Sequence, residues 1–376
     1  MINTPNPKFD SSLTNIILEL EHLKNRSLGS TTSESVFLQL KSLLHAVEAV
    51  ASARIEGNHT TIASYIEKRD DDSHKNDEQI IEISNLIDGL DFIDRFVCEE
   101  PISADFIKEL HRVVVGGLTH EGDKRAGAWR DEPRYIRGAK HQPPEPYDVP
   151  DLMRELIDYI NNDEGEQYDL LKIAIANHRF VWIHPFGNGN GRTDRLMTYA
   201  LLCKKGYIAP NKMRLFNPTA IFAGDRNKYY DMLALADDYK DEHILEWCEY
   251  FLSGVRDEIK KSESLADAEF VNKKILLPSV DRMEKAGVVS KLEGNILGRA
   301  VRLGVVKASD IKDLRGREVT SVAIAQQIKK LRDRNLIKPT KEGGREYEIS
   351  FENSELTRVT LEQMDLAGLL PIRVDR

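Results

Sequence analysis

One stretch of twelve residues, 184–195, combines a titratable base, a glycine-rich turn and two arginines. The base is His184, whose imidazole titrates near pH ~6.5 when unperturbed and can accept a proton at neutral pH. Arg192 and Arg195 carry permanent charges, and a guanidinium donates paired hydrogen bonds to phosphate oxygens. This grouping indicates chemistry on a polyphosphate.

Two apolar segments flank this stretch and must position it. Residues 170–182 form a mostly apolar run typical of a buried helix, and residues 196–201 resume a helical pattern. Between them, Pro185 disfavours helical geometry at His184, and three glycines allow conformations closed to other residues. The turn at 189–191 therefore leads into a helix, whose free N–H groups and positive dipole end can hold an anion. The two arginines are three residues apart and share one side of its first turn.

The stretch resembles the signature of the Fic family, whose pattern is roughly His-x-Phe-x-(Asp/Glu)-Gly-Asn-Gly-Arg-x-x-Arg. One position departs from this pattern, because Asn188 stands where the family usually has an Asp or Glu that holds Mg²⁺. An amide oxygen can ligate Mg²⁺, but it lacks the charge of a carboxylate. The departure therefore weakens the expected metal binding rather than changing the reaction class. The matching positions are His184, Phe186, Gly189, Asn190, Gly191, Arg192 and Arg195.

The resemblance implies an enzyme that transfers AMP from ATP to a Ser, Thr or Tyr hydroxyl of a target protein and releases pyrophosphate. By this resemblance His184 is the general base, Asn188 takes the metal position for Mg²⁺ or Mn²⁺, and the 189–191 turn cradles phosphates. Arg192 holds the phosphate chain and Arg195 its far end. Phosphoryl-type transfer needs mainly positioning and charge stabilisation, so these groups suffice in kind. The alternative is a histidine that is satisfied in a turn shaped by the glycines.

A second motif lies upstream of this stretch. Apolar residues recur at helical spacing over about 34–57, and a glycine and an asparagine follow as stop signals. Ser52 and Glu56 are four residues apart and share one face of this predicted helix. The segment resembles the Fic inhibitory motif, (Ser/Thr)-x-x-x-Glu-(Gly/Asn), of the subclass with an N-terminal inhibitory helix. The resemblance implies that Glu56 pairs with Arg195 and keeps the ATP γ-phosphate from binding productively; the alternative is an ordinary exposed glutamate.

A third feature is a Pro- and Gly-containing segment with a short β-prone core at Tyr135 and Ile136. In Fic proteins the equivalent region contains a β-hairpin flap, on which the target segment adds as an extra strand. The resemblance therefore assigns target docking to Tyr135, Ile136 and Arg137, with a plain surface loop as the alternative. Asn227 and Tyr229 lie where the family often places groups near the base, as nucleotide-binding candidates. For Tyr229, stacking on adenine and core packing both remain open.

Length and composition limit the class of protein. The 376 residues suffice for two or three domains, and 41% hydrophobic with 31% charged residues is ordinary for a globular protein. No run of ~18 apolar residues occurs, so we expect no membrane-spanning helix and no membrane partner. Cys98, Cys203 and Cys248 lie far apart in sequence and form no metal-ligand spacing. With an N-terminus that lacks a secretory apolar core, they favour a cytoplasmic protein.

The overall pattern predicts a mainly α fold in four parts. We expect a helical Fic core with a small β-hairpin flap and a C-terminal winged helix-turn-helix domain. The parts are an N-terminal helical region at 1–100 that contains the helix at about 34–57, the Fic core at 101–255, a linker or helical extension at 256–280, and the winged-helix-like domain at 281–376.

A change of charge marks the C-terminal domain. Residues 281–350 carry 16 Lys and Arg against 10 Asp and Glu, a net charge of +6, which leaves −15 for the rest of the chain. The order of elements is typical of a winged helix, with a two-stranded wing after its third helix. Helices are expected at about 292–303, 308–314 and 320–334, and strands at 336–339 and 347–350. Amide and basic side chains lie on or beside the third helix: Gln326, Gln327, Lys329, Lys330, Arg332 and Arg334.

Such side chains can contact DNA through phosphates and base edges. We favour a protein or homodimer module instead, because +6 is modest and the acidic remainder repels DNA. Two functions follow: an autoinhibited AMP transferase acting on protein hydroxyls, its own included, or a DNA-binding regulator whose Fic core senses a nucleotide without turnover. Asn188 keeps the second open. Relatives that remove AMP, use another nucleotide or transfer phosphate are further alternatives, although Gly191 favours AMP transfer because the Doc relatives have lysine there.

Overall fold

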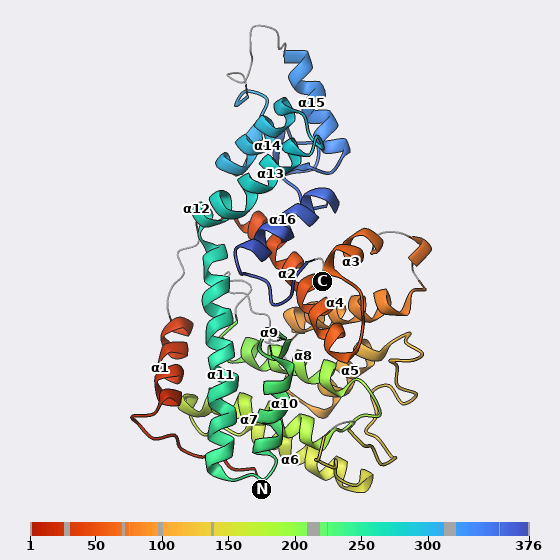
Figure 1. The fold of residues 1–376 in the computed structure, drawn as a ribbon, viewed down its shortest axis with the longest axis vertical. Coiled ribbons are helices and arrows are strands. Elements are labelled where there is room, and N and C mark those ends of the chain that lie inside the picture. Colours follow the sequence, from red (N-terminus) through yellow and green to blue (C-terminus); the bar gives the residue numbers. More distant parts are fainter. Residues whose placement is uncertain are drawn as a thin grey trace. The chain divides into compact units, whose positions relative to one another are not determined.

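The computed structural model describes residues 2–25, 31–69, 72–74, 76–96, 101–136, 139–208, 219–223, 225–311, 321–352 and 354–374. Within these ranges the chain is helical apart from one small sheet (Figure 1). It divides into two compact units, each assembled from segments that are separate in sequence. The first unit is Met1–Ser27, His45–Thr60 and Asp71–Ser262, and the second is Leu28–Leu44, Thr61–Asp70 and Glu263–Arg376.

Helices build the first unit. Its centre is the antiparallel pair α7 (Asp169–Ile183) and α8 (Asn190–Lys204), which are buried on nearly all sides. Helices α4 (Glu78–Phe96) and α5 (Ala104–Val115) pack on α8, and α6 (Val149–Asn161) packs on α7. The remaining helices are α1 (Ser12–Asn25), the second half of α2 (Glu34–Glu56), α9 (Ala220–Ala223), α10 (Arg226–Ala236) and α11 (Asp241–Glu263), with short 3₁₀ turns at Asp72–His74, Pro146–Asp148 and Glu166–Tyr168.

Close packing of α4 on α8 depends on a small residue. A Cβ atom on Gly89 of α4 would lie 2.6 Å from Leu196 Cδ1 of α8, so a larger side chain would separate the two helices. Leu196 is buried, as are most side chains of α8. The fold thus fixes α8, whose first turn carries both arginines of the 184–195 stretch, against α4.

The second unit combines helices with the sheet. Its helices are α3 (Ile62–Lys68), the first half of α2, α12 (Ala268–Phe270), α13 (Leu277–Lys285), α14 (Lys291–Leu303), α15 (Ser321–Asp333) and α16 (Ser354–Leu366), with a 3₁₀ turn at Ser264–Ala266 and a π-helix at Val271–Leu276. The strands β1 (Val306–Lys307), β2 (Ile337–Pro339) and β3 (Glu346–Ile349) form an antiparallel sheet in the order β1-β3-β2. Val306 pairs with Tyr347, and Ile337 pairs with Ile349.

The expected elements of this unit are present with three differences. Helices α14 and α15 and the hairpin of β2 and β3 lie where the pattern predicted them. The helix expected near 308–314 is wrong for residues 308–311, which form a turn, and 312–314 lie outside the described residues. Strand β1 and helix α16 were not predicted: β1 has only two residues, too short for a period-2 pattern.

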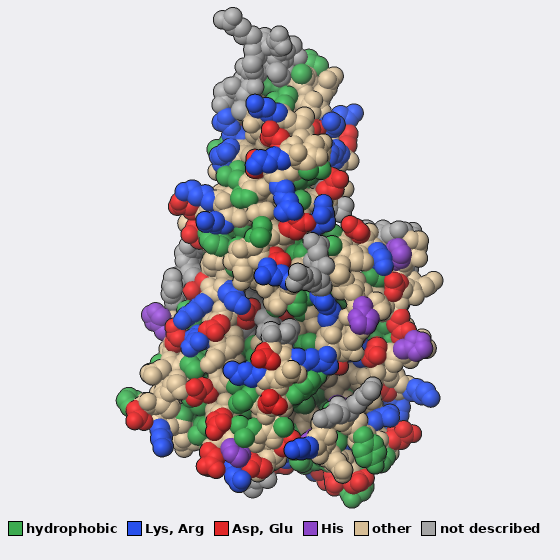
Figure 2. Space-filling model, in the orientation of Figure 1, with side chains coloured by type: hydrophobic (Ala, Val, Ile, Leu, Met, Phe, Trp, Pro, Cys, Tyr) green, Lys and Arg blue, Asp and Glu red, His purple; other side chains and the backbone are tan. Residues whose placement is uncertain are grey.

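The basic side chains near α15 are partly neutralised within the unit. Lys330 Nζ lies 3.0 Å from Glu293 Oε1, and Arg334 lies 3.8 Å from the same oxygen. Lys329 is exposed. On the face drawn in Figure 2, acidic and basic side chains are interspersed. These contacts lower the charge that α15 could offer to a phosphate backbone.

Helix α2 is long and apolar enough to cross a membrane by length and composition alone. However, 78% of its most apolar 18-residue window is buried inside the protein. Its apolar side chains, such as Leu40, Val47 and Val50, are fully buried. This is the behaviour of a core helix.

Candidate active site

His184 ends α7 in a left-handed conformation, with φ 52° and ψ 60°. Arg130 holds it there: its Nε donates to the His184 carbonyl at 2.8 Å, and its backbone N–H donates to the Pro185 carbonyl at 2.8 Å. Arg130 itself is buried. Burial, and to a smaller extent the charge of Arg130, lower the pKa of His184 to about 4. The imidazole is therefore neutral at pH 7 and free of a proton that would prevent it from acting as a base.

The turn after His184 is fixed by its own residues. Asn190 Oδ1 accepts the Phe186 N–H at 2.9 Å, and Asn190 Nδ2 donates to the Phe186 carbonyl at 2.9 Å. Gly189 has φ +73°, and a Cβ atom there would lie 2.8 Å from Val115 Cγ1. Asn190 thus holds the shape of the loop through its side chain.

His111 of α5 packs against this turn, and no position of the Fic signature corresponds to it. Its ring stacks on Phe186 at 3.7 Å between centroids, with an interplanar angle of 6°. The Gly127 N–H donates to Nδ1 at 2.9 Å, so the ring proton is on Nε2, which donates to the Asn188 carbonyl at 3.1 Å. Burial lowers the pKa of His111 to about 4, which keeps this ring neutral. Asp123 completes the support by accepting the N–H groups of residues 187 and 188 at 2.9 and 3.1 Å.

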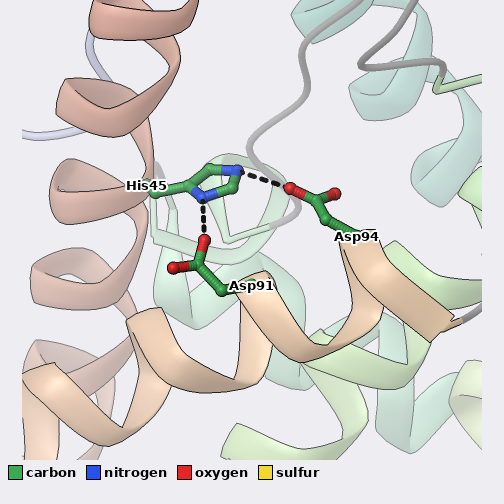
Figure 3. Close-up of side chains that lie close together, drawn as sticks. All are labelled: His45, Asp91 and Asp94. Carbon is green, nitrogen blue, oxygen red and sulfur yellow. Dashed lines mark ion pairs between the residues drawn. The ribbon is translucent and has the colours of Figure 1, made fainter.

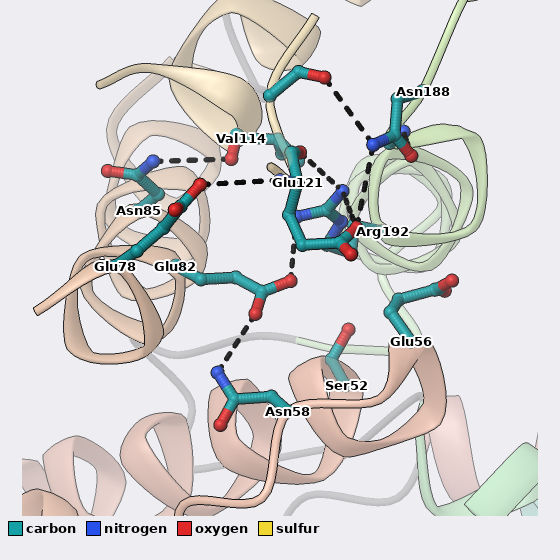
Figure 4. Close-up of polar contacts among 12 residues, drawn as sticks. Ser52, Glu56, Asn58, Glu78, Glu82, Asn85, Val114, Glu121, Asn188 and Arg192 are labelled. Atoms are coloured by element: carbon teal, nitrogen blue, oxygen red, sulfur yellow. Dashed lines mark hydrogen bonds and ion pairs between the residues drawn. The ribbon is translucent and has the colours of Figure 1, made fainter. Parts of the chain in front are cut away.

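Arg192 does not point freely at the turn but forms a buried ion pair. Its Nη1 donates to Glu82 Oε1 of α4 at 2.7 Å, and its Nη2 donates to the Glu121 carbonyl at 2.8 Å (Figure 4). The side chains of Arg192 and Glu82 are 1% and 3% exposed. Burial raises the pKa of Glu82, although the charge of Arg192 opposes this. A carboxylate of α4 therefore sets the orientation of the first arginine.

Arg195 binds the end of α2, as the resemblance implied. Its Nη2 donates to Glu56 Oε1 at 2.7 Å, and its Nε donates to Ser52 Oγ at 2.8 Å. Burial opposes ionisation of Glu56, but the charge and hydrogen bond of Arg195 outweigh it, so the pKa of Glu56 is lowered. The Glu56 carboxylate also lies against Gly191, where a Cβ atom would be 2.5 Å from Oε1. An anionic side chain thus occupies the N-terminus of α8, the position that would attract a phosphate.

Asn188 faces two oxygen-bearing neighbours. Its Oδ1 accepts the Gly189 N–H at 2.7 Å, and its Nδ2 lies 3.4 Å from the Gly122 carbonyl and 3.5 Å from Glu121 Oε2. The carboxylate of Glu121 therefore lies beside Asn188, which has no carboxylate of its own. The N–H groups of residues 119–121 bind Glu78 Oε1, which holds this loop in place.

The predicted β-hairpin flap is wrong for the described residues of its segment, 129–136 and 139–144, which contain no strand. Prolines interrupt the segment and lack the N–H that a ladder requires. Two of its carbonyls are also taken, because Arg130 donates to Glu132 O at 3.2 Å and to Pro144 O at 2.5 Å. Tyr135 is 82% exposed and Ile136 is half-buried, while Arg137 lies outside the described residues.

The two candidates on α10 separate. Tyr229 is buried in an aromatic cluster, with ring centroids 4.7 Å from Phe222 and 6.2 Å from Trp247. Packing in the core therefore accounts for its ring, although the charges of Asp194 and Arg195 both act on its hydroxyl. Asn227 is exposed on the first turn of α10.

Comparison with known proteins agrees with this geometry. Residues 101–202, which include His111, Arg130 and the whole 184–195 stretch, match the model of the Fic/DOC family. The chain is 31% identical over 222 residues to "Protein adenylyltransferase Fic" of Drosophila willistoni, covering 58% of this chain and 40% of that protein. It is 28% identical over 270 residues to the Aedes aegypti protein of the same name, covering 68% of this chain and 50% of that one. The chain thus matches half or less of the length of these curated relatives.

Solved structures show the same fold. A Fic family protein from Desulfovibrio desulfuricans G20 superposes with a TM-score of 0.56 at 18% identity, covering 93% of this chain and 99% of that one. A Fic domain containing signaling protein from Bacteroides thetaiotaomicron gives a TM-score of 0.54 at 19% identity, covering 68% and 98%. The fold of this chain is therefore similar to that of these Fic proteins.

Proposed function

We propose that this protein is an autoinhibited adenylyltransferase, which transfers AMP from ATP to a hydroxyl of a protein side chain. The observation that carries the proposal is the loop between α7 and α8, which places a neutral imidazole beside a helix N-terminus with two arginines. Two similar proteins carry the name adenylyltransferase, which supports the same reaction.

In the proposed reaction the target hydroxyl attacks the α-phosphorus of ATP. The new O–P bond forms while the bond to the bridging oxygen of pyrophosphate breaks, and the hydroxyl proton passes to His184. The N–H groups at the start of α8 and the guanidinium of Arg192 stabilise phosphate charge. Arg195 would hold the far end of the phosphate chain once Glu56 has left it.

The metal ion in this proposal is Mg²⁺ or Mn²⁺. Oxygen ligands suit both ions. In this structure, however, Asn188 Oδ1 accepts the Gly189 N–H and Nδ2 faces Glu121 Oε2, so the two side chains do not present a pair of oxygens to one ion. When bound, the ion would neutralise phosphate charge. The side chains as they lie here do not fit such a group, and Asn188 contributes no charge of its own.

Autoinhibition is proposed from the position of Glu56. Its carboxylate occupies the N-terminus of α8 and pairs with Arg195, so it competes directly with the terminal phosphate of ATP. Ser52 adds a second contact to the same guanidinium. The exposed segment around Tyr135 is the proposed docking site for the target chain, and the α14–α15 region with its sheet is the proposed winged helix, acting as a protein-binding or dimer module.

Intact mass after incubation with ATP and Mg²⁺ or Mn²⁺ tests the function. We expect the Glu56→Gly variant to gain the mass of one AMP at least about tenfold faster than wild type, because a charge-assisted hydrogen bond to Arg195 is lost. The Glu56→Gly/His184→Ala double variant should gain none.

If Glu56→Gly gains no mass, the missing carboxylate at position 188 must be tested as the cause before the proposal is rejected. Asn188→Asp in the Glu56→Gly background restores a carboxylate there. If that variant also stays unmodified while ATP still binds, the chain senses a nucleotide without turnover.

A further inference from the structure

The chain immediately after the inhibitory glutamate is anchored to α4. Gly57 ends α2 with φ +111°; its N–H donates to the Arg54 carbonyl at 3.2 Å, and the Asn58 N–H donates to the Ala53 carbonyl at 3.1 Å. This is the Schellman arrangement, which reverses the chain sharply and depends on a glycine. The reversal directs the Asn58 side chain to α4, where it is 7% exposed.

Three hydrogen bonds hold the Asn58 amide. Nδ2 donates to Glu82 Oε2 at 2.9 Å and to the Gln79 carbonyl at 3.0 Å, while Oδ1 accepts the Thr60 N–H at 2.9 Å. The partners on α4 are one turn apart, so the amide spans the helix surface. A buried amide with these partners is costly to remove from its place.

Glu82 connects this anchor to the first arginine. One carboxylate oxygen accepts from Asn58 and the other accepts from Arg192 Nη1 at 2.7 Å (Figure 4). Residues 56–58 therefore connect two ion pairs. Glu56 binds Arg195, and Asn58 binds Glu82, which in turn binds Arg192. The two arginines that would bind ATP are both held by carboxylates, and Asn58 joins the segments that bear them.

We propose that Asn58 and Glu82 are positioning residues, a latch that holds the inhibitory glutamate on Arg195 and couples its release to Arg192. This rests on the proposed autoinhibited transfer. Glu56 competes with phosphate as a tethered ligand, and its effective concentration depends on how tightly the end of α2 is held. Loosening the latch lowers that concentration without altering Glu56 or either arginine. Because coupling is reciprocal, ATP bound at Arg192 would weaken the hold of Glu82 on Asn58.

The test compares Asn58→Ala and Asn58→Asp in the wild-type and Glu56→Gly backgrounds. In the wild-type background we expect the rate of AMP gain to rise about three- to tenfold for Asn58→Ala, the effect of losing one or two hydrogen bonds. Asn58→Asp should raise it more, because a second carboxylate faces Glu82. In the Glu56→Gly background neither change should raise the rate further, since the latch acts through Glu56.

Asn85→Ala is the matched control. Asn85 lies one turn beyond Glu82 on α4 and donates to the carbonyls of Val114 and Gly116 at 3.2 and 2.7 Å. It is the same residue type with similar bonds, but it does not contact α2. We expect Asn85→Ala to lower the stability of the protein without raising the rate. An equal rise for this variant would show that general loosening, and not the latch, relieves inhibition.

Hydrogen exchange of residues 50–58 separates failure of the latch from failure of the proposed reaction. Asn58→Ala should speed amide exchange there at least about threefold, whether or not AMP is transferred. If Glu56→Gly gains no AMP even after Asn188→Asp is added, the proposed reaction is wrong, and hydrogen exchange alone tests the latch. Unchanged exchange in both Asn58 variants, or an equal rate increase in the Glu56→Gly background, would overturn the proposal.

Discussion

Two histidines beside the same loop, the buried His111 and the half-buried His184, are both neutral at pH 7 but are suited to different tasks. His184 lies at the end of α7 in a left-handed conformation and is the proposed base. His111 is fixed in one tautomer, because Gly127 donates to Nδ1 and Nε2 donates to the loop carbonyl of Asn188. Burial lowers the pKa of each to about 4. Position therefore decides which of two similar imidazoles is available for chemistry.

His111 should make the stability of the protein depend on pH. Its pKa is about 4 in the folded protein and ~6.5 in an unfolded chain, so the unfolded state binds the proton first. The stabilisation is present above pH ~6.5 and is lost as pH falls toward 4. We expect the free energy of unfolding, from urea titrations, to fall by about 2 kcal/mol between pH 7 and 5 on account of this ring.

His111→Gln provides the comparison. It should be less stable than wild type at pH 7, yet lose about 2 kcal/mol less on acidification to pH 5. Parallel pH profiles for the two proteins would contradict the assignment of a neutral, buried ring. The glutamine keeps a polar group near the Gly127 N–H, so the comparison isolates the proton.

Among the elements, α2 carries a polar stripe on an otherwise apolar helix. His45, Glu48, Ser52 and Glu56 recur at spacings of three and four, so they share a face. His45 lies between two carboxylates of α4: Nδ1 is 3.6 Å from Asp91 Oδ1 and Nε2 is 4.0 Å from an oxygen of Asp94 (Figure 3). Because its two nitrogens face different carboxylates, this cluster joins α2 to α4 rather than enclosing one metal ion.

Glu48 supplies a second pH dependence, of opposite sign. It is 3% exposed and accepts both the N–H and the hydroxyl of Thr219. Burial raises the pKa of Glu48 to about 7, although the bonds from Thr219 oppose this. Its proton is therefore kept longer in the folded state, and its contribution to stability is lost as pH rises from ~4.5 through 7.

We expect Glu48→Gln to remove this loss while keeping an acceptor for Thr219. As pH rises from 5 to 8, the free energy of unfolding of the variant should increase by about 2 to 3 kcal/mol relative to that of wild type. Calorimetry across this range measures it. A constant difference between the two proteins would show that Glu48 is already ionised when folded.

The sequence predicted the elements whose pattern is local. The α2 helix, the loop between α7 and α8 and the β2–β3 hairpin all follow from residues close together in the chain. Glu82, His111 and Asp123 were not predicted. Nothing marks them in the sequence, because their partners in the 184–195 stretch lie 64 to 110 positions away and are brought close only by folding. The flap was wrongly predicted from the β-propensity around Tyr135. That propensity does not reveal that Arg130 binds a neighbouring carbonyl, that of Glu132.

At the scale of the whole molecule, α2 belongs to both compact units. Residues 34–44 pack in the second unit, where Phe37 and Leu40 are buried, and residues 45–56 pack in the first. Gln39 binds the sheet region with both ends of its amide: Nε2 donates to Ile349 O at 3.1 Å, and Oε1 accepts the Phe351 N–H at 2.9 Å. A side chain of α2 thus satisfies the backbone where β3 ends.

Replacing Gln39 should test how firmly this half of the helix is held. Gln39→Ala leaves one donor and one acceptor unpaired, and we expect a loss of about 1 to 2 kcal/mol in the free energy of unfolding. Gln326→Ala, on the exposed face of α15, is the control and should change it by less than about 0.5 kcal/mol. Equal effects in denaturant titrations would mean that the Gln39 bonds are dispensable.

The continuity of α2 has a mechanical consequence. From Gln39 to Glu56 the helix rises about 25 Å as one hydrogen-bonded rod, and its described residues contain no proline or glycine at which it could kink. Bending such a rod would break hydrogen bonds of its backbone ladder. Glu56, in the last turn, therefore has no hinge within the helix about which it could swing.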